Sequence, residues 1–358
     1  MASFYSQVGQ EAKAKTVYQN ILELEPNDAR AAMALVGGNQ KSDSDIAFLQ
    51  SLKPIFANPS AGLDDKVKQL IPFIQKVAQD KSNATPLAMA TIELVEILEE
   101  THPNNAKVYS AHGDLLYYTG NAAAALEKYQ QSIDTRKSVY TVWEQMMYIH
   151  TELNDVEALL KLTEEAMDLF PNKAKSYYFN GLANLQQDNY MEAIDMYQQA
   201  LIMSARDPRM QLELHQRLAE AWYQSGKYDR AWASFDKALA LNPKSVKVLS
   251  DYSYSLAQQG IQLEKALSLA ETATKLKPEN PMAQATFGWV YYKKKQYKEA
   301  RNLFEKAINN GGDRVPVILE NYGDVLFQLN EVEAALAQWQ KAQAAGGNSS
   351  MLEKKIND

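Results

Sequence analysis

Apolar and polar positions alternate along the chain with the period of amphipathic helices, and the helical stretches come in pairs joined by short turns. In the stretch 174–280 one arrangement recurs three times: a small residue, a turn, then alanine, a large apolar residue and alanine. The three sets are Ala193, Tyr197 and Ala200; Ala231, Phe235 and Ala238; and Ala266, Ala270 and Ala273, in which alanine takes the place of the large residue. Such pairs are too small to bury their own apolar faces, so the pattern predicts a stacked array of helix pairs.

The first small residue of each set serves as a marker for the length of the repeat. The markers are Ala14, Ala47, Thr91, Ala125, Leu159, Ala193, Ala231, Ala266, Ala300 and Ala335. From Thr91 onward the steps between them are 34, 34, 34, 38, 35, 34 and 35 residues. A period near 34 residues is typical of a helix–turn–helix repeat.

The residues at the fixed places resemble the tetratricopeptide repeat family. Its glycine place, where the two helices of a hairpin cross most closely, holds Gly113, Gly181, Gly288 and Gly323. The aromatic place of the second helix holds Tyr129, Tyr197, Phe235, Phe304 and Trp339, and the proline place holds Pro26, Pro103, Pro171, Pro243 and Pro278. The resemblance covers nearly the whole chain and implies an all-α, right-handed superhelical solenoid of antiparallel helix pairs. The residues of the last three units also resemble those of bacterial tetratricopeptide repeat proteins, especially exported proteins and outer-membrane lipoproteins.

Departures from the regular period predict three parts of the chain. Residues 1–105 are expected to form irregular units, the first truncated and the third with a lengthened first helix that carries Pro72 and kinks there. Residues 106–348 form the regular array, in which the step of 38 residues indicates a longer connection around Pro208. Residues 349–358 predict a polar capping helix, as the end of a solenoid requires.

Charge and composition narrow the function classes. The net charge of −7 disfavours binding to a phosphate backbone, and the absence of cysteine excludes disulfides, thiolate nucleophiles and Cys-ligated metals. No apolar run is long enough to span a membrane, and residues 1–10 lack the pattern of a signal peptide. We interpret the sequence as beginning inside a first helix pair, so an export signal or lipid anchor would lie upstream. That interpretation leans towards a periplasmic or outer-membrane-anchored protein and leaves the compartment open.

Catalytic chemistry has no support in the motifs. The histidines at positions 102, 112, 150 and 215 have no metal-ligand spacing, and neither glycine-rich phosphate-binding motif is present. Adjacent carboxylates such as Glu99 and Glu100 fit a solvated helix face better than a general acid and base. We therefore expect no catalytic residue, no metal and no cofactor.

The resemblance implies that the first helices line a concave groove. The residues expected to face a ligand are Tyr117, Glu144, Tyr148, Tyr178, Gln216, Glu220, Tyr223, Asp251, Trp289, Tyr292, Glu320, Asp324 and Phe327. The lysines and asparagines with which chaperone-binding members grip a terminal carboxylate are absent from these places. An acidic and aromatic groove favours a peptide or partner protein with basic or apolar anchors.

Other functions stay open. The chain could be a spacer or a self-assembling subunit whose groove is empty or filled by its own terminus, and some of the aromatic residues could simply pack between units. The segment 291–301, in which lysines and tyrosines alternate, is a weaker argument for nucleic-acid binding, because lysines at a hairpin turn are usually solvated.

Overall fold

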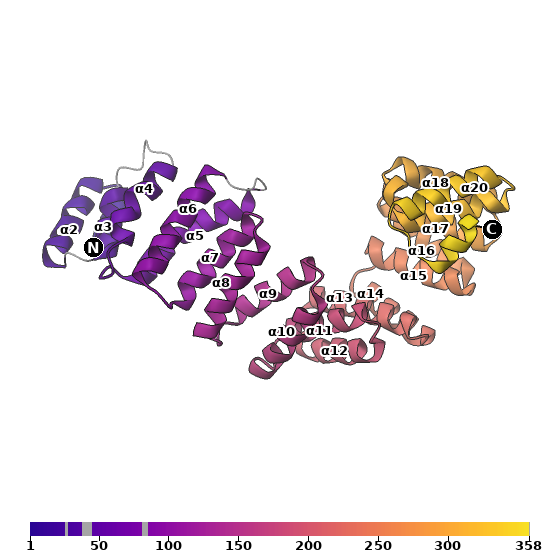
Figure 1. Ribbon diagram of the computed structural model, residues 1–358, viewed down its shortest axis with the longest axis horizontal. Coiled ribbons are helices and arrows are strands. Elements are labelled where there is room, and N and C mark those ends of the chain that lie inside the picture. Colours follow the sequence, from indigo (N-terminus) through magenta and orange to yellow (C-terminus); the bar gives the residue numbers. More distant parts are fainter. Residues whose placement is uncertain (26–27, 38–44, 81–84, 358) are drawn as a thin grey trace. The chain divides into compact units, whose positions relative to one another are not determined.

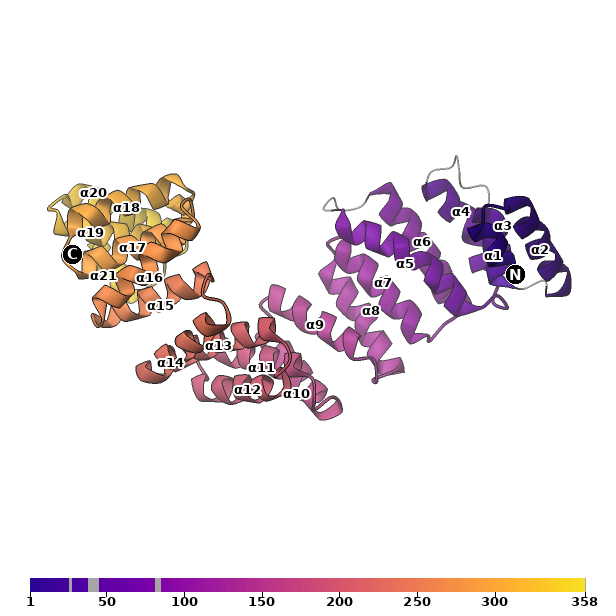
Figure 2. The same cartoon turned by 180° about the vertical axis from the view of Figure 1, so that it is seen from behind.

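The structure, a computed structural model, describes residues 1–25, 28–37, 45–80 and 85–357 and divides into two compact units, Met1–Pro171 and Asn172–Asp358. The helices of the first unit are α1 (Ala2–Gln7), α2 (Glu11–Leu24), α3 (Ala29–Gly37), α4 (Asp45–Phe56), α5 (Leu63–Gln79), α6 (Pro86–Thr101), α7 (Ala106–Tyr118), α8 (Ala122–Thr135), α9 (Tyr140–Glu152) and α10 (Val156–Leu169). Pro26 lies outside the described residues. Both views show α5 to α8 side by side in this unit (Figure 1, Figure 2).

The second unit continues the same succession of helix pairs. Its helices are α11 (Ala174–Gln186), α12 (Tyr190–Met203), α13 (Pro208–Gln224), α14 (Tyr228–Leu241), α15 (Val246–Gln259), α16 (Leu263–Leu276), α17 (Pro281–Lys293), α18 (Tyr297–Asn309), the 3-10 turn η1 (Gly312–Arg314), α19 (Pro316–Gln328), α20 (Val332–Ala344) and α21 (Ser350–Asn357). The described residues contain helices, turns and loops without a strand, so the all-α class and the stacked helix pairs are confirmed. The unit boundary at 171 reflects packing, whereas the predicted boundaries at 105 and 348 concern repeat regularity and stay predictions.

Four of the described hairpins close through contact between a glycine on the first helix and an aromatic residue on the second. A Cβ atom on Gly113 would lie 2.7 Å from the ring of Tyr129, and one on Gly181 would lie 2.6 Å from Tyr197. The same approach is seen at Gly288 with Phe304 and at Gly323 with Trp339. These distances are shorter than any side chain tolerates, which is why the close crossing requires glycine.

The hairpin of α15 and α16 departs from this rule by one residue. Ser253, fully buried, donates a 2.7 Å hydrogen bond from Oγ to the carbonyl oxygen of Ala266, thirteen residues further on. In the next hairpin, a Cβ on Gly288 would lie 3.2 Å from the carbonyl oxygen of Ala300, twelve residues further on. Ser253 therefore takes the glycine place, and two residues separate left-handed Gly260 from α16, where one separates left-handed Gly120 from α8.

The four extra residues around Pro208 lengthen a helix rather than a connection. The connection between α12 and α13 runs from 204 to 207, as long as the connection 136–139 between α8 and α9. Asp207 Oδ1 accepts hydrogen bonds from the backbone amides of Arg209 and Met210, both 3.1 Å long, and Pro208 begins the helix. The prediction of a longer connection was wrong because proline fits the first helical position after an aspartate cap and extends α13 backwards.

The lengthened first helix predicted around Pro72 is α5, which has 17 residues against 13 in α7 and continues through the proline. A single buried cation ties it to its neighbours. Lys66 Nζ donates to the carbonyl oxygens of Phe56 at 3.1 Å and Asn58 at 2.6 Å, and lies 3.0 Å from His102 Nε2. The side chain thus joins the ends of α4 and α6 to α5.

Candidate functional site

In the first unit, the predicted groove residues lie on α7 and α9. The hydroxyl of Tyr117 donates to the Glu152 carboxylate, 2.9 and 3.0 Å from its two oxygens. Burial, followed by this hydrogen bond, raises the pKa of Tyr117 to about 12. Glu144 is half-buried, whereas Tyr148 is exposed. The remaining candidate residues belong to the second unit, so the candidates form two separate sets.

In the second unit, several candidates contact the first helix of the adjacent pair. Tyr178 is buried and its hydroxyl donates to the carboxylate of Glu213 on α13, and burial followed by this bond raises the pKa of Tyr178 to about 12. Gln216 Nε2 donates to Asp251 on α15 at 3.0 Å. The spacing of 35 residues in both contacts is one repeat, as it is between Tyr117 and Glu152. These side chains therefore connect successive first helices.

Two further candidates on α13 also have partners within the chain. Glu220 accepts from Arg217 Nη1 at 3.1 Å, and the hydroxyl of Tyr223 accepts from Gln259 Nε2 at 3.0 Å. Burial raises the pKa of Tyr223. The bond of Tyr223 joins α13 to α15, whereas that of Glu220 lies within α13, and both side chains stay partly exposed.

The aromatic candidates of α17 form a stack. Trp289 is buried, its ring lies 4.7 Å from that of Tyr292 at an interplanar angle of 10°, and its Nε1 donates to Gln258 Oε1 at 3.0 Å. The amine of Lys293 lies 4.9 Å from the centre of the Trp289 ring. Tyr292 is half-buried at the edge of this stack, and burial raises its pKa.

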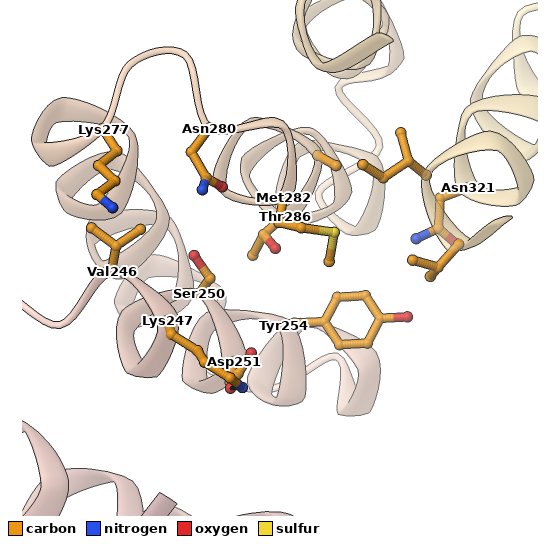
Figure 3. A pocket seen from close by; sticks show the side chains of 13 residues that line it. Val246, Lys247, Ser250, Asp251, Tyr254, Lys277, Asn280, Met282, Thr286 and Asn321 are labelled. Carbon is orange, nitrogen blue, oxygen red and sulfur yellow. Dashed lines mark hydrogen bonds and ion pairs between the residues drawn. The ribbon is translucent and has the colours of Figure 1, made fainter. Parts of the chain in front are cut away.

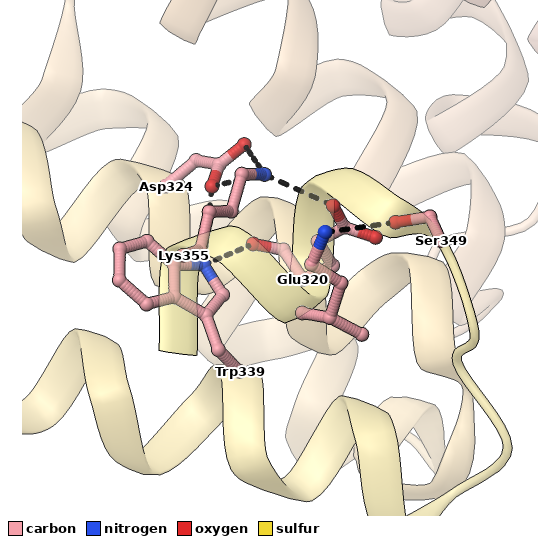
Figure 4. A network of polar contacts seen from close by, with 6 residues as sticks. Glu320, Asp324, Trp339, Ser349 and Lys355 are labelled. Carbon is pink, nitrogen blue, oxygen red and sulfur yellow. Dashed lines mark hydrogen bonds and ion pairs between the residues drawn. The ribbon is translucent and has the colours of Figure 1, made fainter. Parts of the chain in front are cut away.

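The acidic candidates of α19 are held by the chain's own last helix. Lys355 of α21 bridges Glu320 Oε1 at 2.9 Å and the two carboxylate oxygens of Asp324 at 2.7 and 2.8 Å (Figure 4). Trp339 Nε1 donates to Asp324 Oδ1 at 3.1 Å, and Phe327 is exposed beside the Trp339 ring. Burial raises the pKa of Asp324, and the bond from Lys355 opposes that rise.

Two cavities lie along the first helices of the second unit. One, of about 550 Å³, is bordered by α15, α17 and α19 and contains Asp251 at its edge (Figure 3). The other, of about 890 Å³, is bordered by Trp289, Tyr292, Glu320, Asp324 and Phe327 and by α21. The two cavities share Tyr254, Val317 and Asn321 and are therefore neighbours, and together they are called here the α15–α19 trough.

Two trough residues escape prediction from the fixed period. Because Ser253 takes the glycine place, the equivalent inner places on α15 are Ser250 and Tyr254, three before and one after it. Counting 15 and 11 residues back from the marker Ala266, as in the other hairpins, places them at Asp251 and Ser255 instead. The signal that could have revealed the shift is Gly260, which is separated from the next helix by two residues, whereas Gly120 and Gly226 are separated from theirs by one.

Neither a metal centre nor a membrane span emerges from the described ranges. Within them no group of three or more histidine or acidic side chains could hold a metal ion, and no helix has the length and apolarity to cross a membrane. In the segment 291–301, Lys294 pairs with Glu264, while Lys293 lies over Trp289. These two lysines therefore face partners inside the chain.

Comparison with protein families agrees with this geometry. Three family models, each described as tetratricopeptide repeat, match residues 178–246 and 217–281, residues 256–320 and residues 1–28. The chain is a tetratricopeptide repeat protein. In the second unit the matched ranges run from within α11 to within α19, and these tetratricopeptide repeats carry most of the α15–α19 trough.

Similar proteins extend the comparison to the whole tetratricopeptide repeat array. The Protein CTR9 homolog of Arabidopsis thaliana is 27% identical over 207 residues, which are 55% of this chain and 18% of that relative. The chain thus spans less than a fifth of that relative's length. Among solved structures, yeast Tom70 has a TM-score of 0.52 at 15% identity, covering 99% of this chain and 86% of Tom70. The APC/C hetero-tetramer Cut9–Hcn1 has a TM-score of 0.54 at 14% identity, covering 99% and 74%. At these identities the structures show the shared fold alone.

Proposed function

We propose that this chain is a non-catalytic interaction scaffold that binds a segment of a partner protein in the α15–α19 trough. Tetratricopeptide repeat proteins generally mediate protein–protein interactions, and the observation that carries the proposal is the pair of neighbouring cavities on consecutive first helices. A trough that follows three or more such helices suits an extended or helical segment of another chain. The structurally similar Cut9–Hcn1 is itself a hetero-tetramer, an assembly of different chains.

The hydrogen bonds of two partly buried aspartates support a non-catalytic role. Asp114 accepts from the Tyr129 hydroxyl at 2.6 Å, and Asp324 accepts from Trp339 and Lys355. Burial is the main reason that the pKa of each is raised. Because each carboxylate is held inside its own hairpin by the aromatic residue, the raised pKa fits a structural role better than a general acid.

Site-specific crosslinking tests the proposal. A photoreactive amino acid at Val317, which is 38% exposed and borders both cavities, should crosslink a partner protein in cells that make this chain. The matched control is Val332 on α20, which is 51% exposed and borders neither cavity. Crosslinks to one partner from 317 and not from 332 are expected, and Phe327→Arg should weaken them about tenfold by placing a charge in the apolar wall. Equal crosslinking from both positions would contradict the proposal.

A spacer role is the second candidate, favoured by the contacts of Lys355. In that case α21 occupies the acidic end of the trough as an internal ligand. Crosslinks from 317 would then be confined to peptides of α21 or of a second copy of the chain. Light scattering across concentration separates those two results.

A further inference from the structure

The smaller cavity borders a buried hydroxyl that has no partner. Ser250 is 7% exposed, and its Oγ finds no hydrogen-bond partner among the described residues. A buried hydroxyl without a partner destabilises a folded chain, so such groups are uncommon in native structures. Figure 3 shows the side chain pointing from α15 toward the part of the cavity near Asn280 and Thr286. Since serine has three staggered rotamers, rotation is enough to present the hydroxyl to a bound acceptor.

The walls around this hydroxyl are mostly apolar and come from three successive first helices. Val246 and Tyr254 lie on α15, Met282 and Ala285 on α17, and Val317 and Ile318 on α19. Met282 is 45% exposed, which leaves an apolar side chain open to solvent at the mouth. A cavity of about 550 Å³ is within the range of pockets that enclose a ligand, and apolar walls with few polar groups are typical of them.

The charge that remains at the rim of this cavity is positive once the ion pairs within the chain are set aside. Lys247 pairs with Asp251 at 2.8 Å, so these two charges neutralise each other. Lys277 also borders the cavity and makes no ion pair with any residue that the structure describes. The carboxylates at the other end of the trough, Glu320 and Asp324, are already held by Lys355. A basic anchor therefore finds no unpaired carboxylate here.

We propose that this cavity is the specificity subsite of the trough, for a partner segment that carries an apolar side chain close to a carboxylate. The proposal rests on the function proposed above and adds the chemistry of the partner. The apolar side chain fills the space between Met282 and Val317, a main-chain carbonyl accepts from Ser250, and the carboxylate pairs with Lys277.

A library of random twelve-residue peptides displayed on phage is the probe. Selection on the full chain should enrich peptides with a large apolar residue within about two positions of Asp or Glu. Enriched peptides, made synthetically, should bind Met282→Glu and Lys277→Glu at least tenfold more weakly than the unchanged protein. The control Lys298→Glu makes the same charge change at an exposed residue of α18 that does not border the cavity, and should bind as the unchanged protein does.

Ser250→Ala provides a second readout that does not depend on charge. Removing the partnerless hydroxyl should raise the melting temperature of the free protein while weakening the enriched peptides several-fold. Ser255 is the matched control on the same helix, because it is buried and its Oγ donates to the carbonyl oxygen of Tyr252 at 2.9 Å. Ser255→Ala should leave peptide affinity unchanged.

The outcomes separate this inference from the proposed function. If the peptides bind Phe327→Arg more weakly but bind Met282→Glu and Lys277→Glu as tightly as the unchanged protein, the result supports the trough and contradicts the subsite. Enrichment of Lys or Arg in place of Asp or Glu would overturn the chemistry assigned here. Peptides that ignore all three substitutions would count against the trough itself.

Discussion

At the scale of single residues, two tyrosines at the same place of different hairpins make different polar contacts. The Tyr129 hydroxyl donates to Asp114, the residue after Gly113. In the hairpin of α11 and α12, Leu182 stands at the place of Asp114, and the Tyr197 hydroxyl is buried with no partner among the described residues. The same residue type at the same place is thus satisfied in one hairpin and unsatisfied in the other.

This difference predicts opposite responses to removal of the hydroxyl. Tyr129→Phe should lower the free energy of unfolding by about 1–3 kcal/mol, because Asp114 loses a buried donor. Tyr197→Phe, its natural control, should be neutral or stabilising because no bond is lost. Equilibrium unfolding in urea measures both, and an equal loss in the two variants would show that the bond to Asp114 contributes nothing.

A second residue-scale prediction concerns Lys66. Burial lowers its pKa to about 8, below the value of about 10.4 for an unfolded lysine. Between these two values the unfolded chain binds more protons, so the contribution of Lys66 to stability rises with pH from about 8 to about 10 and is lost as pH falls through about 8.

The comparison with Lys66→Met isolates this term. The difference in free energy of unfolding between the unchanged protein and the variant should shift in favour of the unchanged protein by about 1–2 kcal/mol from pH 8 to pH 10. Urea unfolding at intermediate pH values measures it. A difference that is flat across that range would mean that the lysine keeps an ordinary pKa.

At the scale of elements, the first helices are joined by polar contacts one repeat apart. Tyr117 with Glu152, Gln216 with Asp251 and Glu320 with Lys355 all span 35 residues. In the last of these contacts, α21 takes the place that the first helix of another pair would hold. Leu352 is buried in the core beneath it, so this short polar helix also shares the apolar core of its neighbours.

Lys355→Met should therefore loosen α21 specifically. The change leaves the half-buried Glu320 and Asp324 without their cation, and we expect a loss of about 1–3 kcal/mol and faster hydrogen exchange in α21. Lys354→Met is the control, because Lys354 is the exposed neighbour on the same helix. Similar exchange rates in the two variants would remove the bridge as the cause.

At the scale of the whole molecule, each pair depends on its neighbours for a core. In an array of this kind the effect of a local change decreases with distance along the chain. The chain's two compact units support the same expectation, since most contacts stay within each of them.

Gly288→Leu tests this expectation. A Cβ there would lie 2.9 Å from the Phe304 ring, so overpacking should lower stability by about 1–3 kcal/mol. Hydrogen exchange should quicken in α15 to α20 and stay unchanged in α5 to α8. Combining the change with Phe304→Ala should cost less than the sum of the two, and exact additivity would place the clash elsewhere.

Sequence periodicity determined the class of fold, the helix pairs and the contact between glycine and aromatic residue in four hairpins, because these depend on interactions within about 35 residues that recur. It placed Trp289, Tyr292, Glu320, Asp324 and Phe327 around one cavity for the same reason. Only the tertiary structure decided that α15 carries one extra turn residue, which brings Ser250 and Tyr254 to the inner places. It also decided that Lys355 neutralises two of the predicted acidic residues. Both features depend on individual contacts between neighbouring helices. The repeat period gives the spacing of the helices and does not specify which side chain lies at each contact.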